Sequence, residues 1–170
     1  MKMSDKGIKW LKDKEHRVLD KHGNHVVYDD ATRQPVPNNA LLPVGATIGY
    51  GHLVKPSEDF SKGLTEREAI ELLRSDIAVA ERAVQSNVTI HLSQNQYDAL
   101  VSLAYNIGTR GFRHSTVVKY INNPDFYSST YPDLESAWKA WNRTQGKISK
   151  GLINRRQDEW NLYKRGYYQN

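Results

Sequence analysis

The stretch Thr47-Ile48-Gly49-Tyr50-Gly51-His52 is the most informative part of the sequence. Its β-branched and aromatic residues favour a strand, and two glycines at alternate positions indicate a tight hairpin or a close backbone approach. The surrounding region, from about Val26 to Val54, also contains Val26-Val27-Tyr28 and several prolines. We expect this region to form a small antiparallel sheet with a long loop.

Helical patterns flank this region on both sides. Thr65-Glu66-Arg67-Glu68 and Ser93-Gln94-Asn95-Gln96 are capping boxes, in which a hydroxyl and a longer polar side chain satisfy the free amides of a helix start. The apolar spacing after each box predicts a long helix over about 65–85 and a second helix that Gly108 ends. A short helix is expected around Ile8 and Leu11, with Glu15 near its end. Other helices are expected after Ser115, after Pro132, and from Ile153 to Lys164.

These elements predict an α+β fold that is mainly α-helical and has two lobes. We expect one domain over residues 1–170. A small β lobe at about 13–64 would be joined by the helix at about 65–85 to a larger helical lobe at about 86–170, which also includes the N-terminal helix. Such lobes would leave a cleft, and clefts are where ligands usually bind.

Composition excludes several classes of protein. With 38% hydrophobic and 25% charged residues in 170, the chain is typical of soluble globular domains. No run approaches the roughly 18 apolar residues of a membrane span, so we expect no stable membrane insertion, and the first residues lack the apolar core of a signal peptide. The absence of cysteine suits a reducing cytoplasm. The net charge of +5 favours an anionic partner, but no arginine-rich run supports nucleic acid.

Acidic residues near the N-terminus are candidates for glycosidic bond cleavage. That reaction needs a protonated acid at the leaving oxygen and a second carboxylate on the anomeric side. Glu15, Asp20, Asp29 and Asp30 are the candidates. An acidic residue chosen at random is usually a solvated surface charge, so composition alone does not select among them.

Several motifs, in order, resemble glycoside hydrolase family 24, the phage-type lysozymes that include the T-even endolysins. Glu15 corresponds to the family's acid, Leu19 to its leucine, Tyr28-Asp29-Asp30 to its Tyr-x-Asp, and Thr47 to the threonine of Thr-Ile-Gly-Tyr-Gly-His. In the second half, the segments that resemble family motifs are Leu92–Leu100, Tyr105–Gly108 and Gly151–Arg156. The resemblance covers nearly the whole chain, and it implies the lysozyme-like two-lobe fold.

The sequence departs from the family pattern between the acid and the threonine. Glu15 and Thr47 are 47 − 15 = 32 positions apart, about twice the family's spacing, and His16 replaces the usual glycine. The additional residues fall at about 20–27 and 31–46, and we interpret both as loop extensions, since closure entropy grows slowly with loop length. Asp30 is favoured as the second carboxylate because it keeps the Tyr-x-Asp spacing; Asp29 and Asp20 are the alternatives.

The resemblance implies a lysozyme that hydrolyses the β-1,4 bond between N-acetylmuramic acid and N-acetylglucosamine with inversion. Glu15 would protonate the glycosidic oxygen, Asp30 would activate water, and the Thr47 hydroxyl would hold that water. It also implies that Arg155 or Arg156 positions the acid, and that the residues contacting substrate are Tyr50, His52, Tyr105, Asn106 and Ser115.

Some of these residues have structural alternatives. Core packing is an equally good interpretation of Tyr105, and His52 fits a hydrogen-bonding role within the fold better than a catalytic one. No metal or cofactor is expected. His22 and His25 lie near Asp20, but they lack a fuller set of metal ligands. The aromatic and basic segment Trp160–Tyr168 is expected to close the larger lobe.

The leading hypothesis is a monomeric endolysin that stays in the host cytoplasm until a holin opens the inner membrane. It would then cleave peptidoglycan glycan strands in the periplasm. One alternative is the same chemistry in a toxin delivered between bacteria by a secretion system. Another is a wall-binding module without catalytic activity.

Overall fold

The structure is a computed structural model that describes residues 1–169. Helices predominate, and the strands are short, which confirms the prediction of a mainly helical α+β fold. In chain order the elements are α1 (Asp5–Lys14), β1 (Tyr28–Asp29), β2 (Ala46–Ile48), β3 (His52–Leu53), α2 (Glu66–Asn87), α3 (Gln94–Ile107), α4 (Thr109–Arg113), α5 (Thr116–Asn122), α6 (Leu134–Lys139), β4 (Arg143–Thr144), β5 (Lys147–Ile148) and α7 (Lys150–Arg165).

The chain divides into two compact units. Unit 2 comprises Lys12–Asp76, and unit 1 comprises Met1–Leu11 together with the chain from Ile77 onward. Helix α2 begins in unit 2 and continues into unit 1. The assignment of all residues to a single domain stays a prediction.

Unit 2 is built on an antiparallel sheet of three short strands in the order β1-β2-β3. Tyr28 lies opposite Thr47 in one pair, and Ile48 lies opposite His52 in the other. All residues of β2 are buried because this strand is central and has a neighbour on each side. The expected small sheet near the N-terminus is therefore confirmed, and its central strand is the one that carries Thr47.

Gly49 and Gly51 form the tight connection between β2 and β3. Their φ angles of 64° and 93° lie in the left-handed region, where a side chain is strained. Between them, Tyr50 is 3% exposed and packs into the unit. The two glycines therefore serve a tight hairpin, which is one of the two interpretations that the sequence supports.

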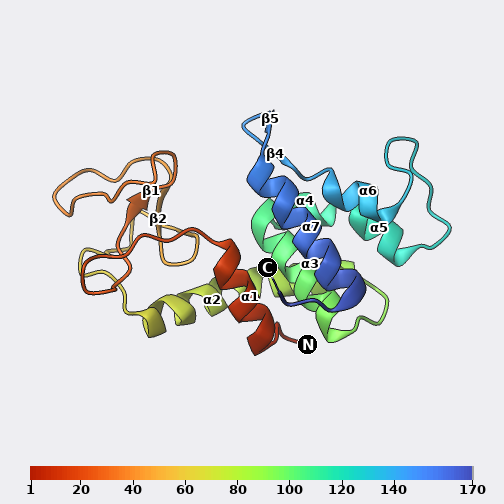
Figure 1. Cartoon of the computed structure of the whole chain (residues 1–170), viewed down its shortest axis with the longest axis horizontal. Helices are drawn as coiled ribbons and strands as arrows, with labels where there is room; N and C mark the ends of the chain where they lie inside the picture. Colours follow the sequence, from red (N-terminus) through yellow and green to blue (C-terminus); the bar gives the residue numbers. More distant parts are fainter. Residues whose placement is uncertain (170) are drawn as a thin grey trace. The chain divides into compact units, whose positions relative to one another are not determined.

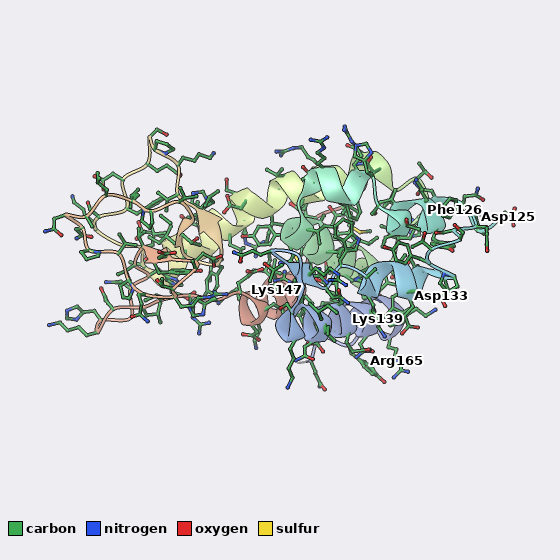
Figure 2. All side chains as sticks on the ribbon, turned by 90° about the horizontal axis from the view of Figure 1, so that it is seen from above. Asp125, Phe126, Asp133, Lys139, Lys147 and Arg165 are labelled. Carbon is green, nitrogen blue, oxygen red and sulfur yellow. The ribbon has the colours of Figure 1, made fainter. Side chains whose placement is uncertain are left out.

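Unit 1 is a helical assembly in which α3 and α7 lie side by side (Figure 1). Residues 97–104 of α3 are all buried, and Trp138 of α6 packs against Trp160 and Tyr163 of α7. In Figure 2, Asp133 and Lys139 mark the two ends of α6, and the Asp133 side chain accepts a hydrogen bond from the Ser136 amide. The aromatic part of α7 therefore contributes to the core, as the sequence predicted.

Asp98, on α3, joins the two terminal segments of the chain. It is fully buried, and its carboxylate accepts hydrogen bonds from the Ser4 amide at 3.1 Å, from Gln94 at 2.8 Å and from the Tyr168 hydroxyl at 2.7 Å. A Cβ on Gly7 would lie 2.7 Å from the same carboxylate, so only glycine fits at this point of α1. One buried carboxylate thus anchors both ends of unit 1.

Both capping boxes form as predicted. The Thr65 amide donates to Glu68 at 2.9 Å while the Thr65 hydroxyl accepts from the Glu68 amide at 3.2 Å, and Ser93 and Gln96 make the same reciprocal pair. The sequence did not predict α4 or the hairpin of β4 and β5. That hairpin turns at Gln145 and Gly146, both with positive φ, and its two-residue strands are exposed, so no hydrophobic alternation marks them.

Candidate active site

Glu15 directly follows the last residue of α1. Its amide donates to the Lys12 carbonyl at 3.2 Å, so the backbone is still fixed by the final turn of the helix. The residue is partly buried. The amphipathic helix, with Ile8, Trp10 and Leu11 buried on one side, therefore holds Glu15 at a defined position at its C-terminal end.

Tyr28, in β1, is a buried phenol that is affected by the charges of Glu15 and Asp30. Its side chain is 1% exposed, and its hydroxyl donates to the His16 carbonyl at 3.2 Å. Burial raises the pKa of Tyr28 to about 12, and the negative charges of Asp30 and Glu15 contribute to this shift. Both carboxylates therefore act electrostatically on one buried phenol, which stays neutral at physiological pH.

Gly45 links Asp30 to Thr47. The Gly45 carbonyl accepts a hydrogen bond from the Thr47 hydroxyl at 2.8 Å and another from the Asp30 amide at 3.3 Å. Thr47 lies opposite Tyr28 in the sheet, and Asp30 is two residues beyond Tyr28. Asp30 directly follows the last residue of β1, so the shared Gly45 carbonyl, rather than strand alternation, is what associates Asp30 with Thr47.

The carboxylate of Asp30 is accessible. Its side chain is 60% exposed and pairs with Arg33 at 3.5 Å across a surface where Arg33 is 52% exposed. Ion pairs of this kind contribute little to stability, so ligand or water can replace the arginine at low energetic cost. Asp30 thus combines a backbone fixed by Gly45 with a carboxylate that solvent reaches.

The two alternative carboxylates have other roles in the fold. Asp29 lies opposite Ala46, hence on the other face of β1, and its carboxylate accepts from the Ala31 amide at 2.8 Å. Asp20 caps a tight turn, where one carboxylate oxygen accepts from the amides of residues 22 and 24 at 2.8 and 3.1 Å. These hydrogen bonds, the one from residue 24 first, lower the pKa of Asp20. The geometry of unit 2 therefore favours Asp30.

Tyr50 belongs to a cluster around Glu66 that the sequence did not reveal. The Tyr50 hydroxyl donates to the Glu66 carboxylate, and Lys12 and His25 each approach that carboxylate at 3.6 Å. Burial, followed by the hydrogen bond to Glu66, raises the pKa of Tyr50. The cation of Lys12 also lies 5.3 Å from the Tyr50 ring centre. Burial and these contacts favour a structural role for Tyr50 rather than contact with substrate.

His52 is also enclosed. It is 7% exposed, with Nδ1 at 2.8 Å from Asp76 and Nε2 at 3.0 Å from Glu58. The hydrogen bond to Asp76 is the largest cause of the raised pKa of His52, and it outweighs the opposing effect of burial. Both ring nitrogens are thus engaged within unit 2, which favours the structural role over the substrate contact.

In unit 1, the expected substrate residues differ in accessibility. Asn106 is exposed and Tyr105 is partly buried, both near the end of α3. Ser115 is 4% exposed, accepts from the Val118 amide and donates to the Phe112 carbonyl, so it is the N-cap of α5. The burial of Ser115 favours this capping role, whereas contact of Asn106 with substrate stays a prediction.

Arg155 and Arg156 share a buried carboxylate, that of Glu159. Arg155 Nε lies 3.2 Å from Glu159, Arg156 Nε lies 2.8 Å from it, and the carboxylate is fully buried. It also accepts from Ser102 at 2.9 Å and from the Trp138 indole at 3.1 Å. The pairing of either arginine with Glu15 stays a prediction. Glu159 follows Arg155 by four residues and Arg156 by three on the same helix. This spacing could have identified Glu159 from the sequence.

Arg156 extends this network to Asn106. One guanidinium nitrogen donates to the Asn106 side-chain oxygen at 2.8 Å, and another donates to the Trp141 carbonyl at 3.2 Å. The buried arginine therefore fixes the orientation of the exposed amide, with the Asn106 oxygen toward Arg156 and its nitrogen outside this contact.

The described residues carry neither a metal-binding cluster nor a membrane-spanning helix. Residues 1–169 contain no group of three or more His, Asp or Glu side chains arranged to hold a metal ion. His22 is exposed, whereas His25 is 1% exposed. Within the same residues, every helix is too short or too polar to cross a bilayer.

Comparison with known proteins identifies similar sequences and structures. The family described as phage lysozyme matches residues 30–159, a range that begins at Asp30 and leaves Glu15 outside it. An endolysin of Salmonella phage P22 is 32% identical over 166 residues, which cover 96% of this chain and 98% of that protein. The endolysin from Escherichia coli O157:H7 phage FAHEc1 has a similar structure, with a TM-score of 0.77 at 28% identity, over 100% of this chain and 98% of the other.

A further relative differs in length. The endolysin of Bacillus phage PZA is 35% identical over 125 residues, covering 71% of this chain but only 44% of that protein. The chain therefore spans less than half the length of this relative, and the similarity to the longer protein concerns one part of it.

Proposed function

Because the chain belongs to the phage lysozyme family, we propose that it is an endolysin that hydrolyses peptidoglycan as a glycosidase. The bond cleaved is the β-1,4 linkage between N-acetylmuramic acid and N-acetylglucosamine. The observation that carries the proposal is the arrangement around Tyr28 and Gly45, which associates an acid, a second carboxylate and a hydroxyl within unit 2.

In this proposal the hydroxyl of Thr47 holds the attacking water. Its single proton is donated to the Gly45 carbonyl at 2.8 Å, so its oxygen is left as an acceptor. A water molecule that donates one proton to Thr47 and the other to the Asp30 carboxylate has its lone pair directed away from both. Removal of the second proton by Asp30 then makes that water the nucleophile, as in an inverting glycosidase.

Glu15 supplies the proton on the opposite side of the reaction. In this mechanism it protonates the glycosidic oxygen as the bond to the anomeric carbon breaks, so the leaving sugar departs as a neutral alcohol. The proton taken up by Asp30 balances the proton given by Glu15, and both carboxyl groups then return to their starting states through solvent. Tyr28, neutral and buried, takes no part in proton transfer.

The phage context follows from the same proposal. The relatives compared above are endolysins of phages, which favours host lysis over a secretion-system toxin. The presence of Glu15, Asp30 and Thr47 argues against a wall-binding module without activity. The net charge of +5 suits an anionic cell wall. In this proposal the protein acts as a monomer. A holin releases it from the cytoplasm, and it then cleaves glycan strands in the periplasm.

The test measures reducing ends released from purified peptidoglycan sacculi. We expect Glu15→Gln and Asp30→Asn each to lower kcat by about 10²–10⁴-fold, while Asp29→Asn and Asp20→Asn, as matched controls, keep most of the activity. An active Glu15→Gln variant would contradict the acid assignment. If Asp30→Asn stays active while Asp29→Asn or Asp20→Asn loses activity, the second carboxylate is that of the control residue and not that of Asp30. NMR of the first-formed product tests inversion, which predicts that the α-anomer appears first.

A further inference from the structure

The chain makes a tight hairpin turn directly after β1, and Arg33 is the last residue of that turn. The Arg33 amide donates to the Asp29 carbonyl at 2.7 Å, and the Asp29 amide donates to the Gln34 carbonyl at 2.9 Å. Short hairpin loops of this kind end in a residue in the left-handed region, and Arg33 has a φ of 61°. The turn therefore requires the backbone conformation that Arg33 adopts.

Arginine is a poor residue for that conformation. A Cβ strains the left-handed region, which is why glycine, and less often asparagine, occupies such positions in turns. Among residues 1–169, the residues other than glycine with a positive φ are Arg33 and Gln145. The turn explains the φ of Arg33 but not its long cationic side chain. A strained residue whose side chain the turn does not need indicates a function for that side chain.

The guanidinium of Arg33 lies beside the carboxylate of Asp30. Its Nη1 atom is 3.5 Å from Asp30 Oδ1, and each side chain is about half exposed. The cation also affects the residue that follows Glu15: burial, and next the charge of Arg33, lowers the pKa of His16. The Arg33 side chain therefore lies within the candidate site of unit 2, next to its second carboxylate.

The contact with Arg33 distinguishes the two oxygens of the Asp30 carboxylate. The backbone of Asp30 is held by the bond from its amide to the Gly45 carbonyl, but a carboxylate still rotates about its terminal bond. A cation beside Oδ1 restricts that rotation and directs Oδ2 away from the guanidinium. Oδ2 is then the oxygen that receives a proton from the water held by Thr47, and a fixed orientation favours this transfer.

Resting on the proposed function, we propose that Arg33 is a positioning residue that holds Oδ1 of Asp30 so that Oδ2 faces the attacking water. The water gives a proton to Oδ2 as its oxygen bonds to the anomeric carbon. The electron pair of the broken bond goes to the glycosidic oxygen, which Glu15 protonates. Arg33 touches none of the reacting atoms. Since Arg33 belongs to the extension at about 31–46, this longer loop contributes a residue to the site.

The test measures kcat and KM on purified sacculi for Arg33→Lys, Arg33→Met and Arg33→Asn. Lysine keeps the charge and the backbone strain, methionine keeps the strain but removes the charge, and asparagine removes the charge and tolerates the left-handed region. We expect Arg33→Lys to keep more than about half of the wild-type kcat. The other two variants should lose kcat by about threefold to fivefold with KM unchanged, because an exposed ion pair contributes a factor of this size.

Thermal unfolding separates positioning from structural support. Arg33→Asn should have a Tm equal to that of the wild type or up to about 4 °C higher, because backbone strain is relieved, although its kcat falls. Gln145→Asn is the matched control, since Gln145 has a φ of 51° in the hairpin of unit 1. It should change Tm in the same direction and leave kcat unchanged. A lower Tm together with a lower kcat in Arg33→Asn would assign Arg33 a structural role and overturn the proposal.

A double-mutant comparison separates this proposal from the proposed function. Since Arg33 acts through Asp30, Arg33→Met should have no further effect on kcat in the Asp30→Asn background. The same loss in both backgrounds would overturn the positioning role, and a change confined to KM would do so in favour of direct substrate contact. Full activity in Arg33→Met with the expected loss in Asp30→Asn would refute the positioning role alone. Full activity in Asp30→Asn would refute the assignment of the base, and the positioning role with it.

Discussion

Replacing Glu159 with glutamine tests the buried ion network of unit 1. The fully buried carboxylate serves two guanidinium groups, at 3.2 and 2.8 Å, and also accepts from a hydroxyl and an indole. Glutamine keeps the shape and one acceptor oxygen but removes the negative charge and brings two donor hydrogens against cationic donors. Removing one member of a buried ion pair costs about 3–5 kcal/mol. We expect a loss of stability of that size.

The same substitution at the surface provides the control. Glu135 pairs with Lys139 at 2.5 Å in a four-residue helical spacing, like that of Arg155 and Glu159, but its side chain is 45% exposed. Exposed pairs of this type contribute about 0.3–0.5 kcal/mol. Glu135→Gln should therefore change stability by less than about 1 kcal/mol.

Urea unfolding followed by circular dichroism measures both variants, and thermal unfolding provides a second readout. For a chain of this size, each kcal/mol lowers Tm by about 2–4 °C, so Glu159→Gln should lower Tm by about 6–20 °C. Equal effects of the two substitutions, or a loss below about 1 kcal/mol for Glu159→Gln, would refute the reasoning. Either result would mean that the two arginines do not depend on this carboxylate.

Further predictions concern unit 2. Thr47→Val should lower kcat about 100-fold with little change in KM, because the acceptor for the attacking water is lost, and Thr47→Ser should restore activity on sacculi. The pKa of His52 is raised on folding, so its contribution to stability is full below its ordinary value of 6.5 and disappears as pH rises through the higher folded value. Urea unfolding between pH 5 and 9 should show this decline, and His52→Gln should flatten it; an unchanged slope would contradict the assignment. Gly63→Ala should destabilise the protein by more than about 2 kcal/mol, since φ is +71° and a Cβ would lie 2.7 Å from the His25 carbonyl. Gly23→Ala, with φ of +81° and open space around it, should lose only about 1–2 kcal/mol, and similar losses for both would argue against the steric contact.

Local features of the fold were predictable because their causes are local in sequence. Thr65 and Ser93 start helices by bonding to residues three positions later, and Gly108 ends α3 with a φ of 89°. The glycines of the β2–β3 hairpin are equally local, since the turn itself requires positive φ. In each case the residues that determine the structure lie within one helical turn or one hairpin.

The candidate site was predictable only in part, for a related reason. The Tyr-x-Asp spacing indicated Asp30, but the link through Gly45 joins Asp30 to Thr47 across the long loop between β1 and β2. The Glu66 carboxylate is contacted by Tyr50, His25 and Lys12. No pattern in the sequence reveals this cluster, because its four residues come from separate segments. Tyr50 and His52, which the resemblance placed at the substrate, are buried by contacts of this long-range kind.

Asp98 has a consequence for engineering. Since Ser4 and Tyr168 both bond to its carboxylate, residues near the two ends of unit 1 lie within a few ångströms of a common atom group. A linker from Tyr168 to Met1 would close the chain and keep the hydrogen bonds that the Met1 and Lys2 carbonyls accept from α3. New termini could be opened in an exposed loop such as that near Tyr127. The chain is thus a suitable starting point for circular permutation.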